Sequence, residues 1–315
     1  MALSLLSSIS KAKSRALIYF IPGNPGLIEY YTPFLSYLRN LVNGAESQQT
    51  AYDIYGRNLL GFVDEEHEPF GQGREPWDLN GQIEGIGQDV ANRRCPDGRP
   101  YDKVILMGHS VGAYIAVEIF SRHTSHLDRN PHVNMEHGFL LFPTLTSIAL
   151  SPSGKRAGTL LAVPGLKPYA HILAKQLLNL FPAFALRYIV GKVTGFGRAA
   201  LETTLQWLSS KDGVWQAIHL AKTEFAEITE EKWDESMWQG DGVPRFFIFY
   251  GEDDHWVDND IRADFIQRRA AGKGTLAHIE VDKGGIQHAF CTQDATSRTV
   301  AEKVFSWVET INGHE

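Results

Sequence analysis

Short runs of apolar residues alternate with longer amphipathic segments along most of the chain. The runs rich in β-branched or aromatic residues are expected to form strands at 16–21, 51–56, 103–108, 138–142, 245–251 and 277–282. Segments with helical periodicity lie at 28–42, 79–94, 111–123, 258–271 and 297–311. This alternation predicts a mostly parallel sheet of about six or seven strands, covered by helices on both faces.

One interval is much longer than a simple connection between strands. About a hundred residues separate the expected strands at 138–142 and 245–251, far more than one helical crossover needs. The segment 137–201 contains no Asp or Glu and is rich in Leu, Phe, Ala, Val and Ile. Its basic residues are Lys155, Arg156, Lys167, Lys175, Arg187, Lys192 and Arg198. The whole chain has a net charge of −7, so the part outside this segment carries about −14.

The stretch GHSVGAY, residues 108–114, lies between an expected strand and an expected helix. A G-x-S-x-G sequence is weak evidence by itself, because a glycine-rich strand-to-helix connection can have the same residues. In this context, the sharp turn forces strained dihedral angles on Ser110 and presents its hydroxyl at the carboxyl end of the sheet. The flanking Gly108 and Gly112 remove side chains that would clash there. We therefore expect Ser110 to be a nucleophile.

A nucleophilic serine on this turn needs an acid and a histidine later in the chain, in that order. The stretch FFIFYGEDDHWV, residues 246–257, places acids directly after a strand. We expect Asp254 to be the acid, because it lies three residues after Gly251. Asp253 is an alternative, and so is Asp258.

The expected base comes from AHIEVDKGGIQHAF, residues 277–290, which places a histidine in a glycine-rich loop after a strand. His288 would take the serine proton while the acid holds its ring. His278, which lies inside the strand and is expected on a packed face, is an alternative, and so is His255. Cys291, three residues after His288, is expected to serve packing.

Ester or amide hydrolysis by a serine also needs two backbone N–H groups that face the developing oxyanion. Val111 follows the nucleophile and is expected to supply one of them. The stretch IPGNPG, residues 21–26, follows the first expected strand and opens a helix, which is where the second donor is expected. Because Pro25 has no N–H, Asn24 is the expected second donor.

Composition and charge limit the function class and the cellular compartment that can be expected. The net charge of −7 argues against a general nucleic-acid binder. The cysteines, Cys95 and Cys291, have no metal-type spacing and favour a reducing compartment. The N-terminus lacks the features of a secretory signal, and no uncharged apolar run reaches the roughly 18 residues of a spanning helix. We expect a protein that is not secreted, with no metal or organic cofactor.

Several of these segments together resemble the lipid droplet-associated hydrolase family, a branch of the α/β-hydrolase superfamily. The resemblance rests on IPGNPGLIEYYTPF, GHSVGAY, LFPTL followed by SPSGKR, FFIFYGEDDHWV and HAF, and it extends from about residue 15 to 312. It implies an α/β-hydrolase fold and a triad of Ser110, Asp254 and His288. It also implies an association with lipid droplets or the cytosolic face of the endoplasmic reticulum, the protein being otherwise cytoplasmic. Few residues precede the first expected strand, so early edge strands should be missing or minimal.

In such a fold, the long interval becomes a helical cap. We expect residues 144–240 to cover the serine, and residues 1–143 and 241–315 to form the hydrolase core. The apolar, basic segment at about 159–196 is expected to contact a droplet or membrane surface from one side. A cap whose lysines are merely solvated is the alternative. Short helices that dip into the surface rather than cross it are predicted by Pro164, Pro168 and Pro182.

The sequence therefore predicts a serine hydrolase that cleaves carboxylic esters of lipid-like substrates, of the neutral lipid or sterol ester class. A thioesterase or a biosynthetic esterase would use the same triad. A droplet-surface protein with little or no turnover is the alternative from another functional class. The sequence names no protein partner and no particular ester.

Overall fold

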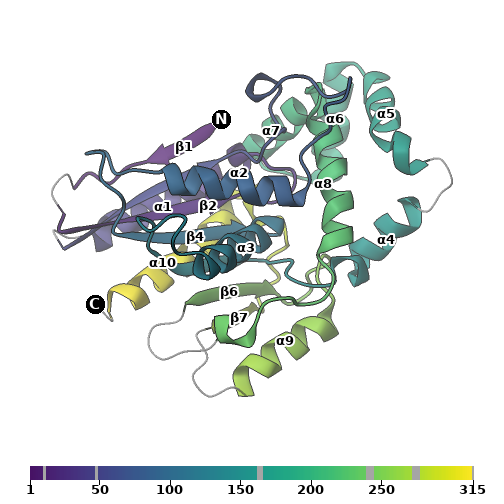
Figure 1. Cartoon of the computed structure of the whole chain (residues 1–315). Coiled ribbons are helices and arrows are strands. Elements are labelled where there is room, and N and C mark those ends of the chain that lie inside the picture. Colours follow the sequence, from purple (N-terminus) through teal and green to yellow (C-terminus); the bar gives the residue numbers. More distant parts are fainter. Residues whose placement is uncertain (10–11, 47–48, 162–165, 239–244, 272–276, 314–315) are drawn as a thin grey trace.

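The computed structural model describes residues 1–9, 12–46, 49–161, 166–238, 245–271 and 277–313 (Figure 1). Within these residues, the strands form one sheet in the order β1-β3-β2-β4-β5-β6-β7. The strands are β1 (Ala2–Leu5), β2 (Ser14–Ile21), β3 (Thr50–Arg57), β4 (Lys103–His109), β5 (Met135–Leu141), β6 (Phe246–Gly251) and β7 (Ala277–Asp282). All neighbouring pairs are parallel except β1 with β3, which confirms the expected mostly parallel sheet.

The short strand β1 lies at one edge of the sheet. It pairs with β3 from Ala2, opposite Arg57, to Leu5, opposite Ile54. Its residues alternate between exposed and half-buried positions, as in a strand with one face toward the protein. The sequence predicted missing or minimal edge strands at this end, and β1 is a minimal one.

Helices cover both faces of the sheet. One face carries α1 (Thr32–Ala45) and α10 (Asp294–Asn312), which pack against each other, and the other carries α2 (Leu79–Asn92), α3 (Val111–Ser125) and α9 (Asn259–Ala271). Successive strand residues point to opposite faces. Accordingly, the ring of Phe246 lies 5.2 Å from that of Phe120 in α3, whereas the ring of Phe247 lies 5.6 Å from that of Trp307 in α10.

The connections contain short 3-10 helices, and one of them changes an expected helix. They are η1 (Ile28–Tyr31), η2 (Asp64–Glu66), η3 (Ile148–Leu150), η4 (Glu235–Met237) and η5 (Phe290–Thr292). The helix expected at 28–42 is divided into η1 and α1. Pro33 lies in the first turn of α1, where its missing N–H costs no helical hydrogen bond.

Between β5 and β6 the described chain is mostly helical. It forms α4 (Pro152–Leu161), α5 (Leu166–Asn179), α6 (Ala183–Thr194), α7 (Arg198–Ser209) and α8 (Gly213–Glu227). Figure 1 shows these helices gathered at one end of the sheet, on the right of the picture. Pro182 precedes α6 and Pro168 lies in the first turn of α5, whereas Pro164 and the expected boundary at 240–241 lie outside the described residues. In the part of the chain that the structure describes, no helix is long and apolar enough to cross a bilayer.

The last of these helices, α8, is joined to the core by side-chain hydrogen bonds. Gln216 is fully buried; its Nε2 donates to the carbonyl oxygen of Trp77 at 2.8 Å, and its Oε1 accepts from the N–H of Trp77 at 2.9 Å. About two turns further along, Thr223 Oγ1 accepts from the N–H of Leu79 at 3.1 Å. These bonds hold α8 beside the start of α2.

Candidate active site

Ser110 occupies a sharp turn between the end of β4 and the start of α3. Its backbone angles are φ 55° and ψ −125°, a conformation that is strained for a residue with a side chain. The neighbouring chain leaves no room beside this turn: a methyl group on Gly108 would lie 2.2 Å from the carbonyl oxygen of Gly112, and one on Gly112 would lie 2.2 Å from that of Ile21. Glycine at both positions therefore permits the turn on which Ser110 stands.

The structure brings Ser110, His288 and Asp254 together in one hydrogen-bonded chain. His288 Nε2 lies 2.9 Å from Ser110 Oγ, and His288 Nδ1 lies 2.6 Å from Asp254 Oδ2. Asp254 is 4% exposed and His288 is 7% exposed. The three side chains come from the loops after β4, β6 and β7, so the parallel sheet places them at one edge.

Asp254 is held as a carboxylate. Burial alone would raise the pKa of its carboxyl group, but the hydrogen bond and charge of His288 and the N–H of Trp256 outweigh burial and keep the pKa below its ordinary value. The Trp256 N–H donates to Asp254 Oδ1 at 2.9 Å, while Oδ2 faces His288. An ionised Asp254 can therefore accept a hydrogen bond from a proton on Nδ1 of His288. Nε2 of the same ring then carries a lone pair toward the serine hydroxyl.

The alternative acids lie elsewhere. Asp253 is exposed. Asp258 caps α9, because its Oδ1 accepts from the N–H of Asp260 at 3.1 Å and from that of Ile261 at 3.2 Å. Neither carboxylate reaches His288 in the described hydrogen bonds.

Neither alternative histidine is hydrogen-bonded to Ser110 in the described residues, although the ring of His255 lies 6.2 Å from that of His288. The expectation that His278 packs inside the fold is wrong: its side chain is 47% exposed and its Nε2 lies 3.0 Å from Glu280 Oε1. The reason is that β7 is an edge strand of the sheet, where alternation does not guarantee a covered face. His255 is exposed and its Nδ1 lies 2.7 Å from Ser153 Oγ in α4. Cys291 is buried, as expected of a packing residue.

The expected oxyanion donors lie beside the serine. Val111 is the first residue of α3, and the N–H at this position has no partner within the helix. The segment that holds Asn24 passes close to the turn, since a methyl group on Gly23 would lie 3.0 Å from Ser110 Cβ. Among the described residues, none accepts a hydrogen bond from the backbone N–H of Asn24.

The structure contains a second buried hydrogen-bond network, built on His109 and Tyr31, which the sequence did not predict. The N–H of Gly23 donates to Tyr31 Oη at 3.0 Å, Tyr31 Oη lies 2.7 Å from His109 Nδ1, and His109 Nε2 lies 2.9 Å from the carbonyl oxygen of His288. A carbonyl oxygen can only accept, so Nε2 of His109 bears the proton and Nδ1 accepts from the tyrosine. This network ties the Asn24 segment, the serine turn and the His288 loop to one another.

Burial keeps His109 neutral. Burial first, and then the proximity of His288, lower the pKa of His109 to about 3. A neutral ring is what the network requires, because a protonated Nδ1 could no longer accept from Tyr31. The signal in the sequence was weak: His109 ends an apolar strand, and nothing in its spacing identifies Tyr31 as its partner.

The neutral His109 predicts a loss of stability in acid. The unfolded chain binds a proton at His109 below about pH 6.5 that the folded protein does not bind until about pH 3. The free energy of unfolding should therefore fall with decreasing pH in this window, by up to about 1.4 kcal/mol per pH unit from this group. In urea titrations, His109→Gln should show a shallower dependence on pH than the unsubstituted protein. Equal slopes between about pH 6.5 and 4.5 would contradict this explanation.

One group of side chains among the described residues has the composition of a metal site. Asp64, His67 and Asp212 offer ligand atoms within 4.8 Å of one another. The carboxylates have a structural use, since Asp64 Oδ1 accepts from the N–H of Asp212 at 3.0 Å and Asp212 Oδ2 accepts from that of Phe70 at 2.9 Å. The two carboxylates link the loop after β3 to the turn between α7 and α8. Neither they nor His67 belong to the Ser110 cluster.

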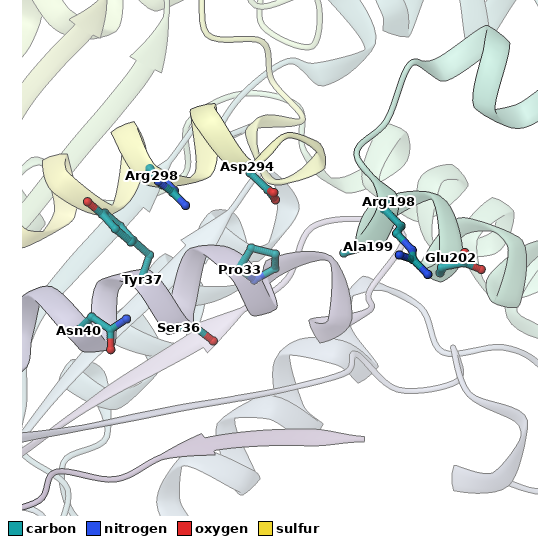
Figure 2. Close-up of a pocket in the computed structure, with 9 residues that line it drawn as sticks. All are labelled: Pro33, Ser36, Tyr37, Asn40, Arg198, Ala199, Glu202, Asp294 and Arg298. Carbon is teal, nitrogen blue, oxygen red and sulfur yellow. The ribbon is translucent and has the colours of Figure 1, made fainter.

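A separate hollow of about 640 Å³ opens between α1, α7 and α10 (Figure 2). Its walls include Tyr37, Arg198 and Arg298, and neither Ser110 nor His288 lines it. Figure 2 shows the lining side chains distributed over the three helices. The hollow is thus separate from the Ser110 cluster.

Comparison with known sequences gives a consistent family. The family model described as lipid-droplet associated hydrolase matches residues 14–291. The lipid droplet-associated hydrolase of Rattus norvegicus is 27% identical over 317 aligned positions, which cover 94% of this chain and 86% of the relative. The protein of the same name from Homo sapiens is 25% identical, over 90% of this chain and 82% of the relative.

Solved structures agree on the fold. A soluble variant of monoglyceride lipase from Saccharomyces cerevisiae superposes with a TM-score of 0.56 at 14% identity, over 97% of this chain and 90% of that chain. Juvenile hormone epoxide hydrolase from Bombyx mori superposes with a TM-score of 0.60 at 12% identity, over 100% of this chain and 77% of that chain. Identities this low establish the fold alone, and that fold is the expected one.

Proposed function

Because the chain belongs to the lipid droplet-associated hydrolase family, we propose that it is a serine hydrolase that cleaves carboxylic esters of lipid-like substrates. The hydrogen-bonded chain of Ser110, His288 and Asp254 is the observation that carries this proposal. A hydroxyl next to an imidazole whose other nitrogen faces a buried carboxylate is suited to nucleophilic attack on a carbonyl carbon.

The proposed reaction has two halves. Ser110 Oγ attacks the ester carbonyl carbon while His288 takes the hydroxyl proton, and Asp254 stabilises the imidazolium that results. The carbon–oxygen bond to the alcohol then breaks, and His288 gives its proton to the leaving alcohol. Water, deprotonated by His288, attacks the acyl carbon. The bond from this carbon to Ser110 Oγ then breaks, His288 returns the proton to the serine oxygen, and the acid is released. The N–H groups of Asn24 and Val111 hold the oxyanion in both halves.

The second element of the proposal is that residues 144–240 form a cap whose outer surface contacts lipid. Most of the exposed large apolar side chains in the described residues lie between 150 and 193, and three of them, Leu180, Phe184 and Val193, are 75%, 77% and 80% exposed. A cluster of this kind favours contact with an apolar phase over permanent exposure to water. The remaining members are Leu150, Tyr169, Ile172, Leu173, Leu177, Phe181, Tyr188 and Ile189.

The basic residues of this segment do not all have the same role. Lys175 Nζ donates to the carbonyl oxygens of Leu208 at 3.2 Å and Ser209 at 3.3 Å, so it caps the end of α7. Arg187 pairs with Glu202. Lys155 lies 3.9 Å from Asp258. Lys192 is exposed beside the ring of Tyr188 and is among those suited to lipid headgroups. This surface would place the protein on lipid droplets or on the cytosolic face of the endoplasmic reticulum.

Replacing Leu180, Phe184 and Val193 together by Gln should weaken binding to lipid emulsions by at least about 100-fold, because burying each such side chain contributes about 1.5–3 kcal/mol. Flotation with phospholipid-coated triacylglycerol droplets measures this. The matched control is Leu127→Gln, a change at an apolar residue that is 59% exposed and lies outside the cap. Flotation of the triple variant equal to that of the control would remove the proposed lipid surface.

Hydrolysis of a graded series of esters tests the proposed reaction. Acyl chains of increasing length should be offered both in solution and on an emulsified interface. The proposal expects turnover that rises with acyl length and is larger at the interface. Absence of turnover on every ester, by a folded protein that binds droplets, would instead support a surface protein without catalysis. A preference for thioesters over the matching oxygen esters would support the thioesterase alternative.

A further inference from the structure

Glu224 is a buried acid in the cap helix α8 that the proposed reaction does not use. It is 5% exposed, and its Oε1 accepts from Asn24 Nδ2 at 3.0 Å. The same Nδ2 donates to the carbonyl oxygen of Ala217, also at 3.0 Å. The side chain of Asn24 is thus bonded twice to α8, across about 200 residues of sequence.

Burial of the Glu224 carboxyl group is energetically unfavourable. No Lys or Arg among the described residues forms an ion pair with it. Burial raises the pKa of Glu224 to about 7, opposed only by the hydrogen bond from Asn24. An apolar side chain would avoid the desolvation of a carboxyl group at this position. The acid is therefore better explained by its bond to Asn24 than by the packing of α8.

Helix α8 is a firm support for this bond. Gln216 and Thr223 join it to Trp77 and Leu79 of the core at distances between 2.8 and 3.1 Å. Glu224 is the residue directly after Thr223, so its carboxyl group projects from an anchored turn of the helix. A group on such a support can hold a neighbouring segment in one position.

The loop that Glu224 holds is the one proposed to receive the oxyanion. The backbone at Gly23 passes beside Ser110, and the N–H of Gly23 donates to Tyr31 Oη. The side chain of the next residue, Asn24, is bonded to α8 at Ala217 and Glu224. These bonds restrain the residue whose backbone N–H is the proposed donor.

We propose that Glu224 is a positioning residue: by holding the side chain of Asn24, it fixes the Asn24 N–H toward the carbonyl oxygen bound at Ser110. This inference rests on the proposed ester hydrolysis. It makes α8 a part of the catalytic apparatus as well as a cover. A displacement of about 1 Å at such a donor is enough to lower turnover by about 100-fold.

The test uses the full chain and a short, soluble p-nitrophenyl ester, so that lipid binding does not enter. Glu224→Leu removes the acceptor and should lower kcat about 10- to 100-fold while KM changes less than about 3-fold. Glu224→Gln keeps a carbonyl oxygen for Asn24 and should restore kcat to within about 3-fold of the unsubstituted protein. Asn24→Ala removes this bond and also the bond to Ala217, and it changes no residue of α8. It should lower kcat at least as much as Glu224→Leu, and adding Glu224→Leu to it should cause no further loss.

A matched control separates positioning from a general effect of removing a carboxyl group from α8. Glu227→Leu makes the same change three residues further along the helix, at an exposed side chain, and leaves the bonds of Asn24 in place. It should leave kcat within about 2-fold. A comparable loss of kcat in Glu227→Leu, or a loss in Glu224→Gln as large as in Glu224→Leu, would overturn the proposal. If Glu224→Leu does not fold, Asn24→Ala decides the question alone.

The failure of this inference can be told apart from the failure of the proposed function. If the unsubstituted protein turns over no ester, the proposed hydrolysis fails first. If it turns over the ester and Asn24→Ala is as active as the unsubstituted protein, the hydrolysis stands and the positioning role of Glu224 is overturned.

Discussion

Replacing Ser110 by Ala should lower kcat for ester hydrolysis by about 10⁴- to 10⁶-fold, because no other group in the cluster can form the acyl-enzyme. The substitution removes one oxygen and leaves Cβ, so it adds no atom that could clash at the strained turn with φ 55°. His288 and Asp254 should remain bonded to each other, since their 2.6 Å contact does not involve the serine. Steady-state hydrolysis of a soluble ester measures the loss.

The control for this variant is binding. Ser110→Ala should float with lipid droplets as well as the unsubstituted protein does, because the exposed apolar surface between residues 150 and 193 lies on other elements. Turnover above about one hundredth of the original value, in a preparation free of contaminating esterases, would exclude Ser110 as the nucleophile.

Replacing Asp254 by Asn should have the second largest effect, with kcat lowered by about 10³- to 10⁴-fold and KM little changed. The amide can donate to His288 Nδ1, which favours the ring tautomer that carries its proton on Nε2. That tautomer cannot accept the proton of Ser110, although the distances of 2.9 and 2.6 Å need hardly change. The buried site also loses the charge that stabilises the imidazolium.

The matched control is Asp253→Asn, the same change on the adjacent, exposed carboxylate. It should leave kcat within about 2-fold, since Asp253 does not reach His288 in the described hydrogen bonds. Asp253→Asn as damaging as Asp254→Asn would mean that the acid is not the one assigned here.

The strands of the sheet could be predicted because each one is recognised from its own short run of residues. Each expected strand lies on an observed one, since a buried parallel strand is a continuous apolar run that needs no distant information to be recognised. The residues of the cluster followed from the same signal: Ser110, Asp254 and His288 each come soon after a strand, in the chain order that the turn requires.

The features that escaped prediction depend on contacts between distant residues. His109 meets Tyr31 across 78 positions, and Asn24 meets Glu224 across 200. A tyrosine, a histidine or a glutamate in an amphipathic helix has no local property that names its partner. The exposure of His278 was mispredicted for a related reason, because the place of β7 at the edge of the sheet is set by the order of all the strands.

The measurement that most directly tests the central claim is labelling with a fluorophosphonate probe, followed by identification of the modified peptide by mass spectrometry. The probe should be applied to the folded protein with and without an emulsified lipid interface. The account predicts one covalent adduct, on Ser110, that is absent from Ser110→Ala. A folded, droplet-bound protein that acquires no adduct, or an adduct on another serine, would contradict the assignment of Ser110 as an activated nucleophile.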